Sequence, residues 1–201
     1  MAWPIGSIGR SGLLTLLTVL IVTGCAKMNV QDFKDNNPVL VLEDYFEGST
    51  KAYGLFEDRF GTVHRQFTVD IEGTVDGDSI KLIEDFLYDD GETEQRIWLL
   101  TRKPGGRYEG HAEAVIGTAT GQVAGNAFNW QYTIDLKMGD STWRVDFDDW
   151  MFLQKDGVLL NKAVVSKWGF TIGTVTLAFR KPADEQSAEG MSHTVHAVAA
   201  E

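Results

Sequence analysis

The feature that most constrains the fold of this chain is an alternation of apolar and polar residues with a period of two, from about residue 49 to about residue 180. Glycine and aspartate interrupt it every ten to fifteen residues or so, and no segment shows a convincing helical stripe, although a short helix at about 38–46 is weakly indicated. Such alternation is typical of strands with one buried face, so we expect an all-β domain. The candidate strands are roughly 49–57, 62–74, 78–88, 93–102, 107–116, 127–138, 141–153, 157–166 and 171–180.

The turn at Asp89-Asp90-Gly91 can be tested through the register that it imposes on its flanking strands. A two-residue turn would place Glu84 opposite an isoleucine, whereas a three-residue loop with a left-handed Gly91 places it opposite Arg96. We choose the longer loop because it opposes apolar to apolar and acid to base. It predicts the pairs Ile80–Leu100, Leu82–Trp98 and Glu84–Arg96.

Two further turns extend the pattern. A turn at Gly139-Asp140 predicts the pairs Leu136–Trp143, Ile134–Val145, Tyr132–Phe147 and Trp130–Asp149, and a turn at Asp156-Gly157 predicts Leu153–Leu160 and Met151–Lys162. Successive hairpins indicate an antiparallel up-and-down meander. We expect its strands, about eight or nine in number, to close into a barrel, because closure removes exposed edges; an open sandwich is the alternative.

The N-terminus predicts a cellular address. An apolar run from Leu13 to Val22 follows Arg10, and Val22-Thr23-Gly24 leads into Cys25, the one cysteine of the chain. The run is too short to span a hydrocarbon core of about 30 Å and has the layout of a secretory signal. The string before Cys25 resembles a bacterial lipobox, which implies acylation of Cys25; an ordinary signal peptide or a buried thiol is the alternative.

The resemblance to bacterial lipoproteins also implies a membrane. Ala26, rather than aspartate, follows Cys25, which favours the outer membrane with the protein facing the periplasm, and acyl chains would make the anchoring effectively permanent. We therefore expect a signal peptide at 1–24, an acylated tether at 25–44, a barrel domain at 45–181 and a flexible tail at 182–201.

Composition excludes several partners. The net charge of −11 argues against nucleic acid, because phosphate neutralisation needs clustered lysine and arginine. With Cys25 acylated, no disulfide can form, so the apolar core must stabilise the fold alone. No Gly-X-Ser-X-Gly string or phosphate loop is present, His64 and His111 lie far apart, and His193 and His196 fall in the tail. We therefore expect no catalytic residues, no metal and no cofactor.

Several strings along the chain resemble one family. They include Tyr45-Phe46-Glu47-Gly48, and the most specific are Glu57-Asp58-Arg59-Phe60-Gly61 and Asp148-Asp149-Trp150-Met151. They are similar to strings in domain of unknown function family 3833, a family of uncharacterised bacterial lipoproteins, and the resemblance covers about residues 45–181. It implies a lipocalin-like barrel, and members encoded beside enzymes that modify fatty acids hint at lipid. The Gly-X-Trp opening of true lipocalins is missing, since Ser49-Thr50 follow Gly48, so ligand binding is carried over by fold analogy.

Candidate ligand-binding residues follow from the predicted registers. Asp149 shares the inward face of its strand with Phe147, and a buried carboxylate needs a partner or a raised pKa. Glu84 and Arg96 form an inward charged pair that either orients a carboxylate-bearing ligand or sets register. Rigid aromatic walls suit a pocket and a packed core equally. The candidate set is Glu84, Arg96, Trp98, Trp130, Tyr132, Phe147 and Asp149.

Three functions remain open at this point. The first is a lipid-anchored, non-enzymatic barrel that binds or shuttles a small apolar or lipid ligand. The second is a structural or assembly protein of the envelope, which a core plugged by Trp98, Trp130 and Trp143 would favour. The third is a lipid- or glycan-modifying enzyme, which a solvent-reachable cluster of Asp149, Glu84 and His111 would favour.

Overall fold

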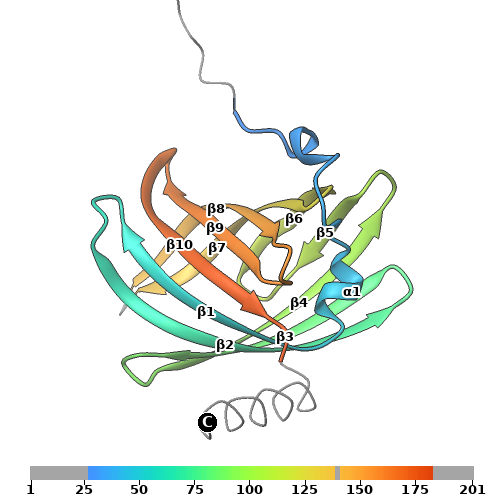
Figure 1. Ribbon diagram of the computed structural model, residues 1–201. Helices are drawn as coiled ribbons and strands as arrows, with labels where there is room; N and C mark the ends of the chain where they lie inside the picture. Colours follow the sequence, from blue (N-terminus) through green and yellow to red (C-terminus); the bar gives the residue numbers. More distant parts are fainter. Residues whose placement is uncertain (1–26, 139–140, 183–201) are drawn as a thin grey trace, which may run out of the picture.

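Ten antiparallel strands form a closed barrel in which β1 pairs with both β2 and β10 (Figure 1). The computed structural model describes residues 27–138 and 141–182. The strands are β1 (Gly48–Asp58), β2 (Val63–Asp76), β3 (Ser79–Tyr88), β4 (Thr93–Lys103), β5 (Arg107–His111), β6 (Val115–Ala124), β7 (Ala127–Met138), β8 (Ser141–Leu153), β9 (Leu159–Lys167) and β10 (Phe170–Arg180). Sequential strands are neighbours throughout, so the predicted all-β, up-and-down barrel is confirmed.

The barrel has one strand more than the expected eight or nine. The candidate strand at 107–116 comprises β5 and the start of β6, and most of β6 escaped prediction. The reason is that inward positions of β6 are small: Ala119 is fully buried, and a Cβ on Gly121 would lie 2.6 Å from Cε3 of Trp130. The indole of Trp130 fills the space that β6 side chains would otherwise occupy, so this strand has no apolar alternation to detect.

Two of the three predicted registers are confirmed. Glu84 faces Arg96 across β3 and β4, and Trp130 faces Asp149 across β7 and β8. The third is wrong by one residue, because Met151 pairs with Asn161 rather than with Lys162, and Leu153 pairs with Leu159. The N–H of Gln154 bonds the carbonyl of Val158, which leaves a three-residue loop ending in a left-handed glycine, as in the β3–β4 hairpin. A slip of one residue exchanges the two faces of a strand.

A short helix, α1 (Leu42–Phe46), covers one end of the barrel (Figure 1). Leu42 and Phe46 are buried in the main core. Glu43 is buried as well, and its two carboxylate oxygens accept hydrogen bonds from the Tyr108 hydroxyl at 3.1 and 2.9 Å, while Nε of Arg102 lies 3.3 Å away. A buried carboxylate held by two donors fixes α1 against the barrel wall. We call this the closed end.

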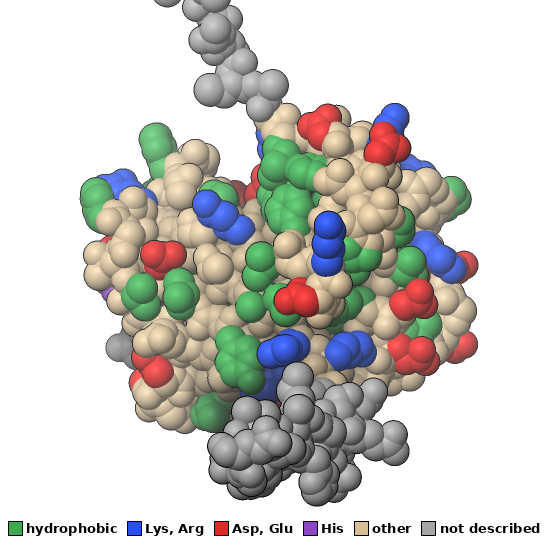
Figure 2. Space-filling view, viewed as in Figure 1, with side chains coloured by type: hydrophobic (Ala, Val, Ile, Leu, Met, Phe, Trp, Pro, Cys, Tyr) green, Lys and Arg blue, Asp and Glu red, His purple; other side chains and the backbone are tan. Residues whose placement is uncertain are grey.

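The segment before α1 lies along the outer wall. A 3-10 turn, η1 (Val30–Phe33), buries Val30 against Trp150, and Phe33 packs edge-on against Phe152 at 5.1 Å between ring centroids. Trp150 and Phe152 point outward from β8, so η1 shields apolar groups that the barrel turns toward solvent. Neither α1 nor η1, the helical segments of the described residues, has the length and apolarity needed to span a bilayer. Acidic and basic side chains are interspersed over the outer face seen in Figure 2.

The seat of α1 depends on a glycine in β2. A Cβ on Gly73 would overlap the carbonyl oxygen of Phe46. We expect Gly73→Ala to lower the free energy of unfolding by about 2 kcal/mol, because overpacking displaces α1 from the closed end. Urea unfolding checks this, with Thr74→Ala, at an exposed position on the same strand, as the control within about 0.5 kcal/mol of the wild type. An equal effect of both variants would contradict the proposed role of Gly73.

Candidate functional site

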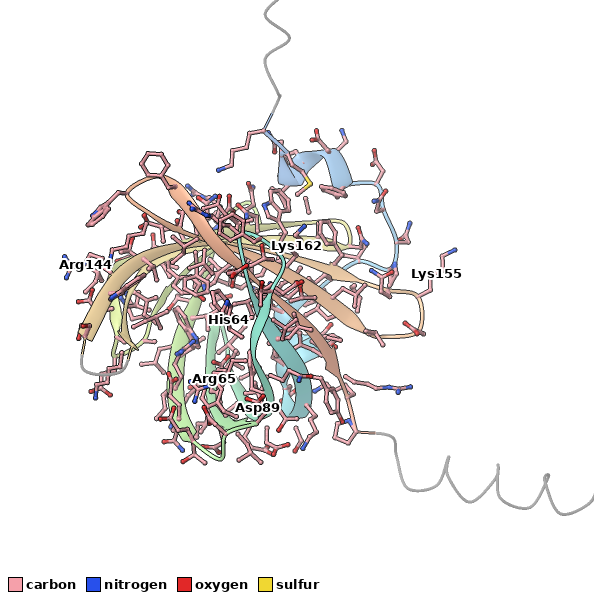
Figure 3. The ribbon with its side chains drawn as sticks, turned by 90° about the vertical axis from the view of Figure 1, so that its left-hand side faces the viewer. His64, Arg65, Asp89, Arg144, Lys155 and Lys162 are labelled. Atoms are coloured by element: carbon pink, nitrogen blue, oxygen red, sulfur yellow. The ribbon has the colours of Figure 1, made fainter. Side chains whose placement is uncertain are left out.

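A cluster of polar side chains lies inside the barrel on the side away from α1. Alternation along each strand points Glu84 of β3, Arg96 of β4, Tyr132 of β7 and Asp149 of β8 inward, on the same faces as the core residues that flank them. The end of the barrel nearest this cluster is the mouth, which carries the connections at 59–62, 89–92, 112–114 and 168–169. Figure 3 faces the mouth, with Arg65 and Asp89 labelled.

Along β3 and β4, the exposure of inward side chains rises toward the mouth. Along β4, Leu100 and Trp98 are buried, the side chain of Arg96 is 17% exposed and that of Glu94 is 42% exposed. Along β3, Leu82 is buried and the inward residues beyond it are half-buried. The closed half of the barrel is therefore filled by its own side chains, and solvent reaches the inward side chains of β3 and β4 in the mouth half. On β7, β8 and β9, the inward Ile134, Val145 and Val165 stay buried in an apolar cluster of their own.

Arg96 forms its salt bridge with a neighbour on its own strand. Its Nη2 lies 2.7 Å from Oε1 of Glu94, whose Oε2 accepts a hydrogen bond from the Tyr88 hydroxyl at 2.9 Å. The described residues contain no ion pair of Arg96 with Glu84, so the predicted partner was the wrong one, although the predicted register is correct. Burial alone would lower the pKa of Arg96, but the charges of Glu84, Tyr132 and Glu94 outweigh it and raise the pKa.

Two acids of the cluster have raised pKa values. Burial raises the pKa of Glu84 to about 7, against the opposing effect of Arg96. Burial, together with the charge of Asp148, raises the pKa of Asp149 to about 8, with Arg96 again opposing. Asp149 is only 7% exposed, and its Oδ1 has no hydrogen-bond partner within the described residues. Burial and the nearby charge of Asp149 also hold the pKa of Tyr132 well above its ordinary value.

Aromatic rings wall the cluster. Trp98 contacts Trp130 and Tyr132 edge-on, at 5.8 and 5.2 Å between ring centroids, and Tyr132 stacks on Phe147 at 4.9 Å. These are the aromatic residues of the candidate set, and the barrel brings them together with the polar ones. Trp143 does not join them. It lies 37% exposed toward the mouth end of β8, with Nζ of Lys167 3.8 Å from its ring centroid.

Sequence reasoning missed the part of the cluster nearest the mouth. Tyr88 and Glu94 bond each other, Arg96 lies over the Phe86 ring at 5.0 Å, and the guanidinium of Arg65 stacks on Tyr88 at 3.5 Å. Arg65 also binds Asp90 and Glu92 of the β3–β4 connection. The signal was available, because Phe86, Tyr88 and Glu94 continue the inward alternation of β3 and β4 in the register that places Glu84 opposite Arg96. The two-residue periodicity alone could have extended the candidate set.

The family can now be stated, because a family model matches most of the chain. Residues 19–181 match the model of a family described as "Protein of unknown function (DUF3833)". The chain belongs to this family. No curated protein matches it. Among solved structures, the S-type phycobiliprotein lyase CPES from Guillardia theta is similar, with a TM-score of 0.51 and 10% sequence identity over 70% of this chain and 91% of that one. At this identity the similarity shows a shared lipocalin-like fold and nothing about chemistry.

The remaining candidates of this DUF3833 chain lie apart from the cluster. His111 follows the inward Gly110 and is exposed on the outer face, so it does not join Asp149 and Glu84. The described residues hold no group of three or more histidine, cysteine, aspartate or glutamate side chains placed to bind a metal ion. Cys25, His193 and His196 fall outside the described residues, so the predictions made for them stand as predictions.

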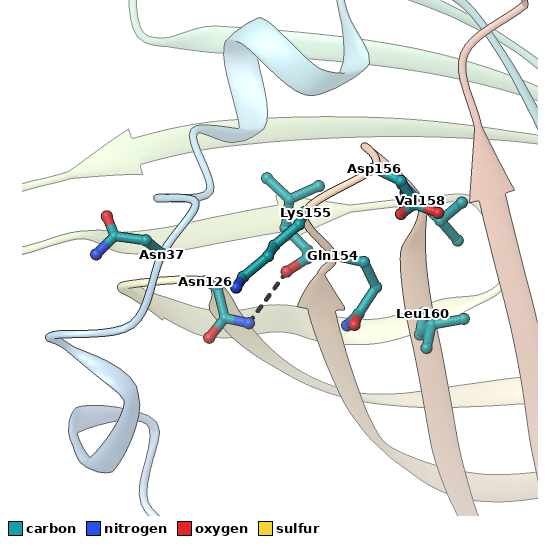
Figure 4. A pocket seen from close by; sticks show the side chains of 8 residues that line it. Asn37, Asn126, Gln154, Lys155, Asp156, Val158 and Leu160 are labelled. Carbon is teal, nitrogen blue, oxygen red and sulfur yellow. Dashed lines mark hydrogen bonds between the residues drawn. The ribbon is translucent and has the colours of Figure 1, made fainter.

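Two clefts lie on the outside of the barrel. One, of about 600 Å³, is open to solvent between Asn37 of the N-terminal segment and the β8–β9 hairpin, where Nδ2 of Asn126 donates to the carbonyl of Leu153 (Figure 4). The other, of about 500 Å³, runs along the outer faces of β7 and β8 beside Lys27, which forms an ion pair with Asp148 at 3.2 Å. Neither contains a buried charge, so the inward cluster is the stronger functional candidate.

Because Asp149 holds its proton in the folded state up to about pH 8, whereas its ordinary pKa is 3.8, the unfolded chain binds fewer protons between these values. The wild-type protein therefore loses stability as the pH rises through this range, by up to about 1.4 kcal/mol per pH unit from this group. We expect Asp149→Asn to raise the free energy of unfolding, by a margin that grows with pH and levels off above about pH 8. Urea unfolding across this range measures the margin.

The matched control is Asp146→Asn, which makes the same chemical change at an exposed position of β8 whose carboxylate accepts from Thr133 at 2.7 Å. This variant should leave the pH dependence of the wild type in place. A margin for Asp149→Asn that is the same at all pH values would show that Asp149 is ionised in the folded protein.

Proposed function

We propose that this protein is a lipid-anchored barrel that binds a small, largely apolar ligand in the mouth half of its interior. The observation that carries the proposal is Asp149, a buried carboxyl group with an unpartnered Oδ1, set beside Arg96 and Tyr132 among aromatic rings. Such a group lowers the stability of the empty barrel and is explained by a ligand that bonds to it.

The two halves of the interior differ in what fills them, and this difference supports the proposal. The closed half holds a continuous apolar core from α1 to Trp98 and Trp130 and needs no ligand to fill it. The mouth half combines half-buried rings with a few polar groups that converge on one region, which is the usual composition of a small-molecule site. An apolar ligand would stack on these rings and exchange water for the polar groups beneath them.

A binding role fits better than catalysis in this chain. The similar solved structure is named a lyase, so a barrel of this fold is compatible with an enzyme. Here, however, the groups that act on Asp149 and Glu84 are Tyr132 and Arg96 and not a nucleophile, and His111 lies on the outer face. We therefore propose carriage or sequestration of the ligand. A protein that works only through its outer surface is the second candidate, favoured by the filling of the closed half by Trp98 and Trp130.

The proposal places the barrel at a membrane. The lipobox-like string ending at Cys25 and the alanine that follows it support acylation and an outer-membrane, periplasm-facing location. The described chain begins at Lys27, two residues after Cys25, and Lys27 already contacts the barrel through Asp148. The acylated residue would thus be separated from the folded domain by very little chain, so we propose that the barrel works close to the membrane surface.

Ligand binding can be tested with the neutral dye N-phenyl-1-naphthylamine, whose fluorescence rises in apolar surroundings. We expect saturable binding at one site, and a loss of about tenfold or more in affinity for Ala163→Leu, because Ala163 is buried directly opposite Asp149 on β9 and a larger side chain fills the site. Ala178→Leu, at an outward position of β10, is the matched control and should bind as the wild type does. Absent binding, or equal binding by both variants, would favour the outer-surface role.

Anchoring can be tested in cells by separating inner membrane, outer membrane and soluble fractions. We expect the wild-type protein to incorporate radiolabelled fatty acid and to sediment with the outer membrane, and Cys25→Ser to do neither, because the acyl acceptor is lost. Ala26→Asp should move the protein to the inner membrane. A Cys25→Ser protein that still incorporates fatty acid, or that still sediments with the outer membrane, would disprove anchoring through this residue.

A further inference from the structure

We propose that the group recognised in the mouth half is a cation that donates hydrogen bonds, such as the primary ammonium of an amphiphile, and not a carboxylate. The inference rests on the proposed binding function and names its chemical class. It is the opposite of one of the two interpretations that the sequence left open for Glu84 and Arg96, namely that the pair orients a carboxylate-bearing ligand.

The balance of charge inside the barrel favours a cation. Around Arg96, the inward side chains supply three carboxyl groups, those of Glu84, Glu94 and Asp149, against the guanidinium of Arg96 itself. Arg96 is already bonded to Glu94 at 2.7 Å. Nearer the rim, Arg65 is likewise bound by Asp90 and Glu92. A carboxylate ligand would have to displace Glu94 from Arg96 and then face two further acids, whereas a cation would find Glu84 and Asp149, which have no ion-pair partner among the described residues.

The unpartnered oxygen of Asp149 calls for a hydrogen-bond donor. Oδ1 of Asp149 is buried without a partner in the described residues, and Tyr132 next to it supplies a donor rather than a further acceptor. An ionised carboxylate only accepts hydrogen bonds, and an ammonium group only donates them. A donor reaching this depth would satisfy Oδ1 with a charge-assisted bond, which is about twice as strong as a neutral one.

The aromatic wall of the site also favours a cation. Trp98, Tyr132 and Phe147 contact one another around the acids, and their ring faces carry partial negative charge. The barrel already uses this property, because the guanidinium groups of Arg96 and Arg65 lie over the rings of Phe86 and Tyr88. Aromatic faces next to carboxylates attract a cation and repel an anion.

The acids also couple binding to pH. The charged and titratable groups that act on Asp149 are Tyr132 from β7, Arg96 from β4, Glu84 from β3 and Asp148 on its own strand. With pKa values of about 8 for Asp149 and about 7 for Glu84, both acids are largely protonated in mildly acidic solution. A cation binds the ionised form, so its arrival lowers these pKa values and releases protons. Cation affinity should therefore rise with pH, and anion affinity should fall.

The test compares three ligands of equal chain length: octylamine, octanol and octanoate. The protein is the full chain carrying Cys25→Ser, which has no acyl acceptor. Calorimetric titrations at about pH 6 and about pH 8.5, in two buffers of different ionisation enthalpy, give the affinity and the number of protons released. We expect octylamine to bind most tightly, with about a tenfold gain between the two pH values and net proton release.

Variants identify the group responsible. Asp149→Asn should abolish most of the pH dependence of octylamine binding, and Glu84→Gln, which tests the second acid independently, should reduce it in part. Asp146→Asn, on the outer face of β8, controls for general attraction of amines to an acidic protein.

The possible outcomes separate the two proposals. Binding of octanol or octanoate with an affinity equal to or above that of octylamine overturns the cation proposal and leaves the binding function standing. Octylamine binding that Asp149→Asn and Asp146→Asn reduce equally overturns it as well, because attraction would then be general. Failure of all three ligands to bind overturns the binding function itself.

Discussion

The rest of the structure depends on the pairing of β1 with β10, which closes the sheet. In a closed sheet every strand has both edges hydrogen-bonded, so a residue has only two environments available, the interior or the outer face. Closure therefore assigns each side chain of the alternating sequence either to the interior or to the outer face. It explains why Glu84, Arg96 and Asp149, which are distant in sequence, meet inside the barrel, and why their neighbours Asp85 and Asp148 face outward.

The two ends of the barrel differ in how they hold a buried acid. At the closed end, α1 brings Glu43 into the interior, but the carboxylate finds Tyr108 and Arg102, so the charge is fully bonded. Toward the mouth, Asp149 is buried to a similar degree with one oxygen unbonded. The contrast matters, because it shows that this fold can satisfy a buried acid where the acid serves stability. A group left unsatisfied under the same constraints indicates a different purpose.

The sequence predicts the in-or-out assignment well where turn chemistry is unambiguous, and fails where two turns compete. Asp89-Asp90-Gly91 and Lys155-Asp156-Gly157 form the same loop with a left-handed third residue, yet only the first was distinguished, because Glu84 and Arg96 tested its register. The second hairpin lacks a charged pair, and the slip placed Lys162 inside instead of Asn161. Strand β6 was missed for a related reason: Gly121 makes room for Trp130, a relation between strands that alternation within one strand does not reveal.

The choice of partner by Arg96 shows why a site is harder to predict than a register. Backbone pairing places Glu84 directly opposite Arg96, but the guanidinium reaches along its own strand to Glu94, nearer solvent, where ionisation of the acid costs less. Burial alone would raise the pKa of Glu94, yet Arg96 holds it below its ordinary value, while Glu84 deeper in the barrel moves to about 7. Arg96 thus keeps Glu94 ionised, whereas the deeper acids Glu84 and Asp149 keep pKa values near neutral pH. Desolvation, which depends on depth in the closed barrel rather than on sequence spacing, therefore decides the chemistry that the site offers a ligand.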